Sequence, residues 1–188
     1  MRRALGYLAA VLVPLLLGHA LAHAHLDSSE PANGAAAADV GSVVLRFTEA
    51  VETGFSTFKV LRLEEALAAV GLPAQATAAH DHGEPATAGG HDEHGDPAAA
   101  GDEDHGHQAA LDPALEAQAQ AVAAAVLADA GFATGLVPAV ADPPSGAHEE
   151  LTLVFAQPLE PGTYVVVWRA LSVDSHAADG WLVFEVTD

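Results

Sequence analysis

Hydrophobic and polar residues alternate along several short segments of this chain. In the first of them, Val43, Leu45 and Phe47 fall on one face and the residues between them fall on the other. A two-residue period of this kind is typical of strands with one buried face. This alternation, or a run of β-branched and aromatic residues, occurs in five segments: 42–47, 57–63, 150–155, 163–168 and 181–186. Many short strands separated by Gly and Pro turns predict an all-β fold, a β-sandwich.

Most aromatic residues lie within these strand patterns, and we assign them to the core of the sandwich rather than to a cofactor site. They are Phe47, Phe155, Tyr164, Trp168, Trp181 and Phe184. His148 stands beside Glu149 and Glu150 and is predicted to lie at the surface.

An alanine-rich segment in the middle of the chain carries the signals of one helix. Asp112 suits the N-cap, Pro113 the first helical position and Gly131 the C-cap, so the helix is expected over residues 113–130. Its apolar stripe is narrow, sufficient to dock on a sheet but not to found a second domain. The stripe consists of Val122, Val126 and Leu127. We therefore predict one domain that is interrupted over residues 64–131.

The composition changes abruptly between residues 80 and 107. These 28 residues contain six histidines, eight acidic residues and six glycines, but no Lys or Arg. Such a segment cannot bury enough apolar surface to offset its ordering entropy, so it is predicted to be a mobile loop. We expect it to bind copper(II), zinc or nickel with low affinity, and a solvated acidic linker is the alternative. Its histidines are His80, His82, His91, His94, His105 and His107.

The first 22 residues follow the three-part plan of a secretory signal peptide. Two arginines make a basic start, an apolar run covers residues 4–18, and the small residues Ala20 and Ala22 precede the expected cleavage site. An uncleaved membrane anchor is the alternative, but the apolar run is shorter than the about 20 residues that span a bilayer. We therefore expect export to the periplasm and a mature domain over residues 23–188.

Charge and the lack of sulfur restrict the chemistry of the mature chain. Loss of the signal peptide, with its two arginines, lowers the formal net charge from −20 to −22. Such a chain repels nucleic acid and anionic lipid and attracts cations. The sequence has no cysteine, and its only methionine, Met1, leaves with the signal peptide. Any copper site must therefore use imidazole, amine and carboxylate groups, which favours copper(II).

Cleavage after Ala22 would place His23 at the new amino terminus. An α-amino group has an unperturbed pKa of about 7.7–8.0, so a metal can displace its proton near neutral pH while the adjacent imidazole closes a chelate. Copper(II), which prefers tetragonal nitrogen and oxygen sites, is the leading candidate. His25 opens a competing mode through the amine, two backbone amides and its own imidazole. Because Leu26 begins a predicted strand with a committed backbone, we favour the first mode, with His25 as an accessory group or a plain surface residue.

Both ends of the mature chain carry a family resemblance. It rests on three segments: His23-Ala24-His25-Leu26, Leu45-Arg46-Phe47-Thr48-Glu49, and the run from Gly162-Thr163-Tyr164 through Trp168-Arg169-Ala170-Leu171-Ser172-Val173-Asp174-Ser175-His176 to Gly180. These residues resemble the CopC family of periplasmic copper-resistance proteins. The likeness covers residues 23–63 and 135–188 and fails across the middle. A Tyr-x-Val-x-Trp-Arg strand followed by Ser-x-Asp-x-His is far more specific than a lone His or Asp pair.

The resemblance implies a Greek-key sandwich of about seven strands, similar to immunoglobulin and cupredoxin folds, that binds one copper(II) through a histidine brace. His23 would supply its amine and a ring nitrogen, His176 a third nitrogen, and Asp174 an oxygen near an axial position. Glu49 matches an additional acidic ligand or supporting group of some members. Three nitrogens in a plane with a weak oxygen suit copper(II), whereas closed tetrahedral sites suit zinc. The methionine-rich copper(I) loop of other members has no counterpart here.

The spacing of Asp174 and His176 is compatible with a shared ion. In an extended segment both side chains would point to one side while Ser175 points away. Without its neighbours, however, Asp-Ser-His after a strand is typical of a solvated turn. We also expect Arg169, one of four basic residues in the mature chain, to pair with a carboxylate near the metal and orient it.

These features predict a binding protein and not an enzyme. The chain shows no nucleophilic serine constellation and no nucleotide-binding loop, and it lacks the platform of exposed aromatics that brace-type copper oxygenases often use. We expect a periplasmic copper(II) carrier or buffer in copper resistance or homeostasis, with no membrane anchor after cleavage. Its partner would be a membrane copper transporter or another periplasmic copper protein, and not nucleic acid. A zinc or nickel scavenger that acts through the histidine-rich loop, and a brace-type oxygenase, remain the alternatives.

Overall fold

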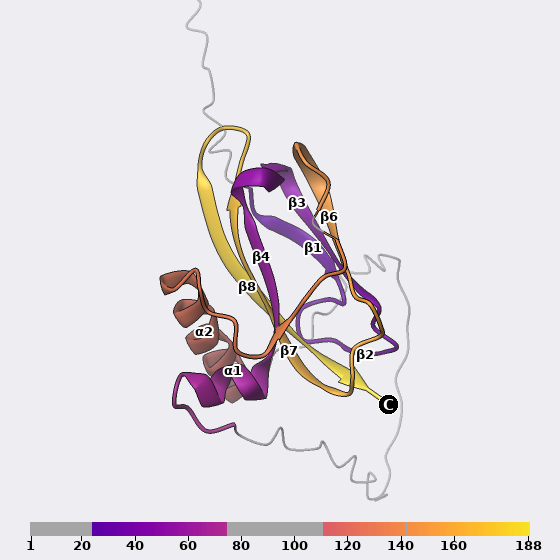
Figure 1. The fold of residues 1–188 in the computed structure, drawn as a ribbon, viewed down its shortest axis with the longest axis vertical. Helices are drawn as coiled ribbons and strands as arrows, with labels where there is room; N and C mark the ends of the chain where they lie inside the picture. Colours follow the sequence, from indigo (N-terminus) through magenta and orange to yellow (C-terminus); the bar gives the residue numbers. More distant parts are fainter. Residues whose placement is uncertain (1–23, 75–110, 142) are drawn as a thin grey trace, which may run out of the picture.

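The computed structural model describes residues 24–74, 111–141 and 143–188. Within them, eight strands form two sheets, and two helices lie against one of the sheets (Figure 1). The elements are β1 (Leu26–Glu30), β2 (Ala36–Ala38), β3 (Ser42–Glu52), the 3-10 helix η1 (Thr53–Phe55), β4 (Thr57–Arg62), α1 (Leu63–Ala69), α2 (Pro113–Ala128), β5 (Leu136–Val137), β6 (Ala147–Val154), β7 (Gly162–Leu171) and β8 (Ala177–Thr187). The predicted β-sandwich is confirmed, with one strand more than the expected seven.

The two sheets differ in size. One has three antiparallel strands in the order β1-β3-β6, and the other has five in the order β2-β8-β7-β4-β5, in which only β2 runs parallel to its neighbour. Strands β3, β7 and β8 extend beyond the predicted segments at one or both ends, and β3 continues to Glu52 instead of ending at Phe47. β6 begins three residues earlier than predicted, and β4 and β6 each end one residue earlier. Alternation in the sequence marks only the buried part of a strand, whereas backbone hydrogen bonds also hold its polar ends.

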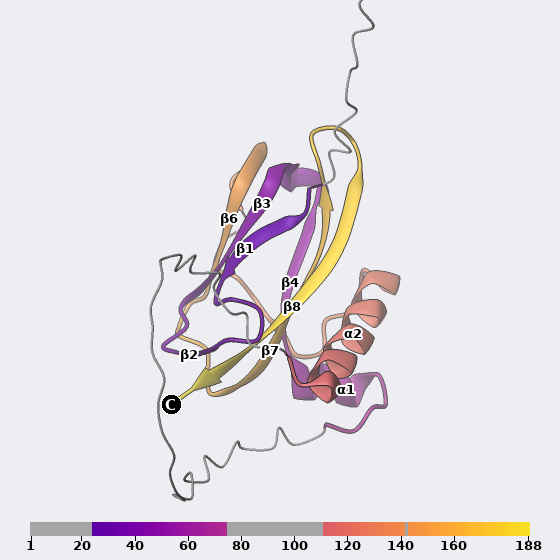
Figure 2. The same cartoon turned by 180° about the vertical axis from the view of Figure 1, so that it is seen from behind.

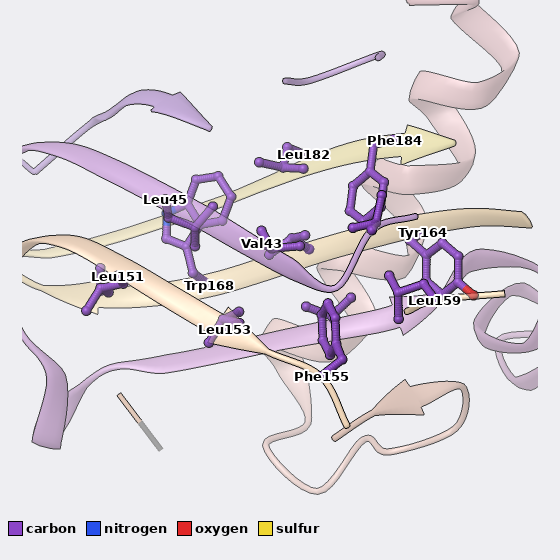
Figure 3. Packing of buried hydrophobic residues seen from close by; sticks show 14 of the residues in the cluster. Val43, Leu45, Leu151, Leu153, Phe155, Leu159, Tyr164, Trp168, Leu182 and Phe184 are labelled. Carbon is purple, nitrogen blue, oxygen red and sulfur yellow. The ribbon is translucent and has the colours of Figure 1, made fainter. Parts of the chain in front are cut away.

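The main core fills the space between the sheets. Figure 3 shows side chains of both sheets there, among them Val43 and Leu153 from one sheet and Phe184 from the other. Trp168 lies edge-on to Phe47, with ring centroids 6.0 Å apart. Five of the six aromatic residues assigned to this core are confirmed, but Trp181 is not among them. Its side chain packs on the opposite face of its sheet, against the helices.

A second core lies between the five-stranded sheet and the helices. Val165 and Val167 of β7 face α1 and α2, while Tyr164, Val166 and Trp168 of the same strand face the other sheet. Both faces of β7 are therefore buried, and the helices cover apolar surface that would otherwise be exposed to water. Figure 2 shows them beside the strands on one side of the sandwich.

The helices differ from the prediction in two respects. α1 was not predicted, because a seven-residue segment directly after a strand is too short to show a clear helical period. α2 begins as expected, since Asp112 Oδ1 accepts a hydrogen bond from Ala114 N at 2.8 Å. It ends at Ala128, however, with Asp129 as the C-cap, so the Gly131 C-cap was wrong. The amide of Gly131 donates instead to Asp129 Oδ1 at 2.8 Å.

The long axis of β7 separates two ends of the sandwich. At the first, Arg62 pairs with Tyr164 and leads directly into α1; we call it the helix end. At the second end, residues 172–176 connect β7 to β8 and lie beside η1. We call this end of the sandwich the turn end (top of Figure 1). β7 has ten residues, which corresponds to about 30 Å at ~3.3 Å per residue. No helix among the described residues is long and apolar enough to cross a membrane.

Candidate metal centre at the turn end

The first strand enters the sandwich at the turn end. The backbone N–H of His25 donates to Thr48 Oγ1 at 3.1 Å, and the N–H of Thr48 donates to the His25 carbonyl at 2.9 Å. Ala24, directly before it, is 1% exposed and belongs to the main core. The backbone around His25 is therefore held in the sheet, as the sequence led us to expect.

A bulge in β3 carries the next candidate residue. Arg46 pairs with Glu150 and Val51 pairs with His148, so β3 has four residues where β6 has only Glu149. Extra residues of this kind bend a strand and change the direction of its side chains, and they are frequent beside functional sites. Beyond the bulge, β3 reaches the other sheet, where Val51 forms a bridge with Ser172. The bulge thereby brings Glu49 close to the β7–β8 connection.

Hydrogen bonds join this bulge to residues 172–176. The hydroxyl of Ser172 donates to Glu49 Oε2 at 3.2 Å, and the amide of Val173 donates to the carbonyl of Ala50 at 3.2 Å. Within the connection, the amide of Ser172 donates to the carbonyl of His176 at 2.8 Å, which closes the turn. One side-chain and one backbone hydrogen bond therefore define where the turn lies relative to β3.

Asp174 and His176 contact each other across the turn. Asp174 Oδ1 accepts from the backbone N–H of His176 at 3.0 Å, and Oδ2 lies 2.9 Å from His176 Nδ1. An ionised carboxylate can only accept, so Nδ1 carries the proton and Nε2 is the nitrogen with the lone pair. A carboxylate that fixes the tautomer and orientation of an imidazole is typical of metal-binding histidines. The His176 side chain is 62% exposed, so an ion bound there would lie at the surface.

The same contacts change the acidity of Asp174. The backbone N–H of His176 is the largest influence that lowers the pKa of the Asp174 carboxyl below its ordinary value, and partial desolvation opposes it. Hydrogen bonds to the charged form stabilise that form. Asp174 therefore remains ionised at and well below neutral pH, as a metal ligand or a partner of an imidazole must.

The structure corrects the reason given for the Asp174 and His176 spacing. Residues 173–175 form a turn and a bend, not an extended segment, and Ser175 has a φ of 71°. The two side chains meet because the turn folds back on itself, and not because residues i and i+2 share one side of a strand. The backbone thus forms the turn that the sequence without its neighbours suggested, and this turn brings the side chains of Asp174 and His176 together.

Arg169 also differs from the prediction. Its guanidinium binds both carboxylate oxygens of Asp179, its cross-strand neighbour, at 2.7 Å each. This bidentate pair raises the pKa of Arg169 and lowers that of Asp179, chiefly through the side-chain hydrogen bond. Asp179 lies on β8 and was not a predicted ligand. The expected role of Arg169 in orienting a metal-binding carboxylate is therefore replaced by a clamp between two strands.

The structure brings together part of the predicted site. Glu49, Asp174 and His176 lie in one hydrogen-bonded cluster with Ser172, and His25 lies at the same end through its backbone. Over residues 24–74, 111–141 and 143–188, no group of three or more His, Asp or Glu side chains has the geometry of a metal site. The signal peptide, His23 and the predicted loop with His80, His82, His91, His94, His105 and His107 lie outside the described residues.

Sequence reasoning assigned no role to three residues at this end. Ser172 is 1% exposed, and its place two residues after Ala170 and four after Trp168 in the inward-facing series could have revealed a buried hydroxyl. Phe55 and Val173 are large apolar side chains that are 77% and 53% exposed. Phe55 lies in the 3-10 helix η1 and Val173 in the turn after β7, both outside the strand patterns, so no periodicity indicated their exposure.

A comparison with protein-family models bears on this arrangement. Residues 115–187 match the model of the CopC domain, a range that runs from α2 to β8 and includes Asp174 and His176. This part of the chain is therefore similar to a CopC domain. Glu49 and His25 lie before the matched range. Glu49 contacts Ser172 within it, and His25 lies at the same end through its hydrogen bond with Thr48, the neighbour of Glu49. A search of curated protein sequences gave no match.

Two solved structures are similar to this chain. PcoC, a methionine-rich copper resistance protein from Escherichia coli, is 19% identical, with 88% of this chain and 100% of that chain covered and a TM-score of 0.47. CopC from Methylosinus trichosporium OB3b is 20% identical, with 87% and 93% covered and a TM-score of 0.44. The first is described as methionine-rich, whereas this chain has one methionine. At identities this low, neither structure assigns a role to a residue of this chain.

Proposed function

We propose that this chain is an exported copper-binding protein of copper resistance or homeostasis that holds copper(II) at the turn end. Copper binding as such is supported by the CopC domain and by the copper-resistance proteins to which the chain is similar. The observation that carries the site is the contact between Asp174 and His176, 2.9 Å apart, beside the bulge that holds Glu49. It presents an oriented imidazole and two carboxylates at one exposed place.

The remaining nitrogen ligands would come from His23. A peptide bond joins His23 to Ala24, and His25 is hydrogen-bonded to Thr48, the neighbour of Glu49. A mature chain that starts at His23 would therefore carry its amine and imidazole within a residue's length of this end, because consecutive Cα atoms are about 3.8 Å apart. With His176 this makes three nitrogens, and Asp174 adds an oxygen, a set that suits copper(II).

The competing mode through His25 is disfavoured by its backbone. That mode needs the amides of residues 24 and 25 to be deprotonated and to face the ion. The His25 amide already donates to Thr48, and Ala24 is buried in the core. Copper would have to remove part of β1 from the sheet, at the expense of these hydrogen bonds. We therefore keep His25 as an accessory group at most.

The exposure of the site supports carriage. A carrier must pass its ion to another protein, and a ligand that is 62% exposed can be approached by incoming ligands of that protein. We propose a membrane copper transporter or another periplasmic copper protein as the recipient. We propose binding in place of oxygenase chemistry, although Phe55 is one exposed aromatic near this end. Oxygen- or peroxide-dependent turnover of a polysaccharide or other substrate by copper-loaded protein would contradict this choice.

Electron paramagnetic resonance of bound copper(II) tests the site directly. Protein that begins at His23 is compared with protein that carries one extra residue before it, so that the amine is displaced and all side chains are kept. We expect an axial spectrum with three equatorial nitrogens for the first form and a loss of high affinity for the second. The same spectrum and affinity in both forms would show that the amino terminus is not a ligand and that copper is bound elsewhere.

A further inference from the structure

Ser172 is the only polar residue that is buried among the described parts of the chain, at 1% exposure. It follows Trp168 and Ala170 in the inward-facing series of β7, where the core would otherwise favour an apolar side chain. A buried hydroxyl costs free energy unless its hydrogen bonds are made. An alanine or valine at this position would avoid that cost. The contacts of the hydroxyl must therefore explain why a polar residue is found here.

The hydroxyl of Ser172 connects two separate parts of the candidate site. It donates to Glu49 Oε2 at 3.2 Å and accepts the backbone N–H of Asp174 at 3.4 Å. Glu49 belongs to the bulge of β3, and Asp174 belongs to the turn after β7. A hydroxyl has one donor and can accept twice, so one side chain satisfies both contacts.

The backbone of Ser172 makes this connection rigid. Its amide donates to the His176 carbonyl at 2.8 Å, its carbonyl accepts from the Ser175 amide at 2.9 Å, and it forms a bridge with Val51. The residue therefore sits where the turn, the end of β7 and the end of β3 meet. Any shift of its side chain would move Glu49 relative to Asp174 and His176.

We propose that Ser172 is a positioning residue of the metal site, which sets the distance of the Glu49 carboxylate from the Asp174–His176 pair. This inference rests on the proposed function. Ser172 does not contact the ion; it acts through Glu49 and through the amide of Asp174. Loss of a partner that orients a metal ligand typically lowers metal affinity by about 10–100-fold. A hydroxyl with a purely structural role would instead affect stability and leave the bound ion unchanged.

The test uses the mature protein that begins at His23, with copper(II) alone as the probe. For Ser172→Ala we expect a dissociation constant about tenfold or more higher, by competition with a chelator, and an altered paramagnetic resonance spectrum. Ser172→Thr keeps the hydroxyl and should restore both. Without copper, hydrogen exchange of the Asp174 amide should accelerate in Ser172→Ala, while the Val173 amide, bonded to Ala50, stays protected.

Ser56→Ala is the matched control. The Ser56 hydroxyl also holds two elements together at this end, since it accepts from the Leu171 amide at 2.9 Å and donates to the Glu52 carbonyl at 2.8 Å. It contacts neither Glu49 nor Asp174 in the hydrogen bonds described. We expect its loss to lower thermal stability and to leave the copper spectrum and affinity at the parent values.

Glu49→Ala, which removes the carboxylate that Ser172 is proposed to position, keeps the proposal testable if Ser172→Ala is difficult to fold, and it should lower copper affinity by itself. Where both variants fold, a double-mutant cycle measures how far the two residues act together. If the two residues act as a unit, the second substitution adds little to the effect of the first on copper affinity. Fully additive effects, or parent affinity and spectrum in Ser172→Ala, would overturn the proposal. Failure of the parent protein itself to bind copper at the turn end would overturn the proposed function, which makes the two failures distinguishable.

Discussion

The two ends of β7 belong to one strand, but they differ in how their side chains are used. At the helix end, Tyr164 stacks on Phe184 with ring centroids 5.7 Å apart, and its hydroxyl donates to the Glu160 carbonyl at 2.8 Å. At the turn end, Asp174 and His176 form an exposed pair beside a bulge. One end is packed on both faces, and the other presents oriented polar groups.

Under the proposed function, stability and copper binding are separated along the strand by about 30 Å, at ~3.3 Å for each of its ten residues. Substitutions at the helix end should change the free energy of unfolding and leave copper affinity unchanged. Substitution of the proposed ligand His176 at the turn end should do the reverse at neutral pH. Sites farther apart than about 7–10 Å with no shared partners usually contribute independently.

The largest effect is expected from Leu67→Ala in α1. Leu67 is 1% exposed in the core between the helices and the sheet, so its truncation should lower the free energy of unfolding by about 2–5 kcal/mol. Urea denaturation of metal-free protein measures this loss. Leu72→Ala, at a position that is 41% exposed, is the control and should change stability by no more than about 0.5 kcal/mol. A comparable loss in copper affinity for Leu67→Ala would contradict the separation.

The next effect is the loss of His176. His176→Ala should lower copper(II) affinity by more than the about 10–100-fold that an outer-shell partner contributes, because it removes a proposed ligand. Thermal unfolding of the metal-free protein should stay close to the parent. His148→Ala is the matched control, since His148 lies on β6 with Nε2 3.2 Å from the Ser145 carbonyl and outside the proposed ligand set. Equal affinity losses in both variants would argue against the site.

Removal of residues 80–107 should have no effect on the tight site. The described residues on either side of this segment belong to the helix end, where Gln118 Nε2 donates to the Pro73 carbonyl at 3.2 Å. We expect the resonance spectrum and the high-affinity dissociation constant of copper(II) to be retained. In equilibrium dialysis, the weakly bound copper, zinc or nickel ions per protein molecule should be lost. If the tight copper is lost instead, the segment carries it and the histidine brace is wrong.

The smallest effects concern acid stability. Asp174 and Asp179 both have a lowered pKa, the first mainly through the His176 amide and the second mainly through Arg169. Each contributes stability that is present above the ordinary carboxyl range of about pH 4 and is lost as pH falls through the lowered folded pKa. Asp174→Asn and Asp179→Asn should therefore each reduce the dependence of thermal unfolding on pH below about 4.

Copper binding distinguishes the two carboxylates. Asp174→Asn should weaken copper(II) binding, whereas Asp179→Asn, whose parent residue pairs with Arg169 on the neighbouring strand, should leave it unchanged. A chelator competition at neutral pH measures both. Copper affinity at the parent value in both variants would show that Asp174 neither binds copper nor orients His176.

Much of the fold could be predicted because the period of two is a local property. The inward series of β3, with Val43, Leu45 and Phe47, was visible in the sequence and is buried as expected. Trp181 was misplaced because the outer face of β8 is apolar where Trp181 and Val183 pack against the helices, although Glu185 on the same face is exposed. α1 was missed because its apolar face is defined only by the sheet it packs on.

The candidate site was predictable in its residues and not in its geometry. The Ser-x-Asp-x-His motif marked Asp174 and His176, but the extended geometry with which their spacing was compatible is replaced by a turn. The role of Arg169 depended on which carboxylate its neighbour strand carries, and register alone decides that this is Asp179. No local pattern predicts a bulge in β3, since its extra residues are defined against the partner strand.

The sequence by itself determined the class of the fold. It also showed that Met1 is the only sulfur-containing residue, and it thereby determined the types of group that a copper site can use. These follow from composition and from local periodicity, which need no knowledge of neighbours in space. Only the tertiary structure decided that Glu49, more than 100 residues earlier in the chain, meets the Asp174–His176 turn through the hydroxyl of Ser172. That contact arises because backbone pairing between distant strands fixes their register, and register is a property of the folded chain alone.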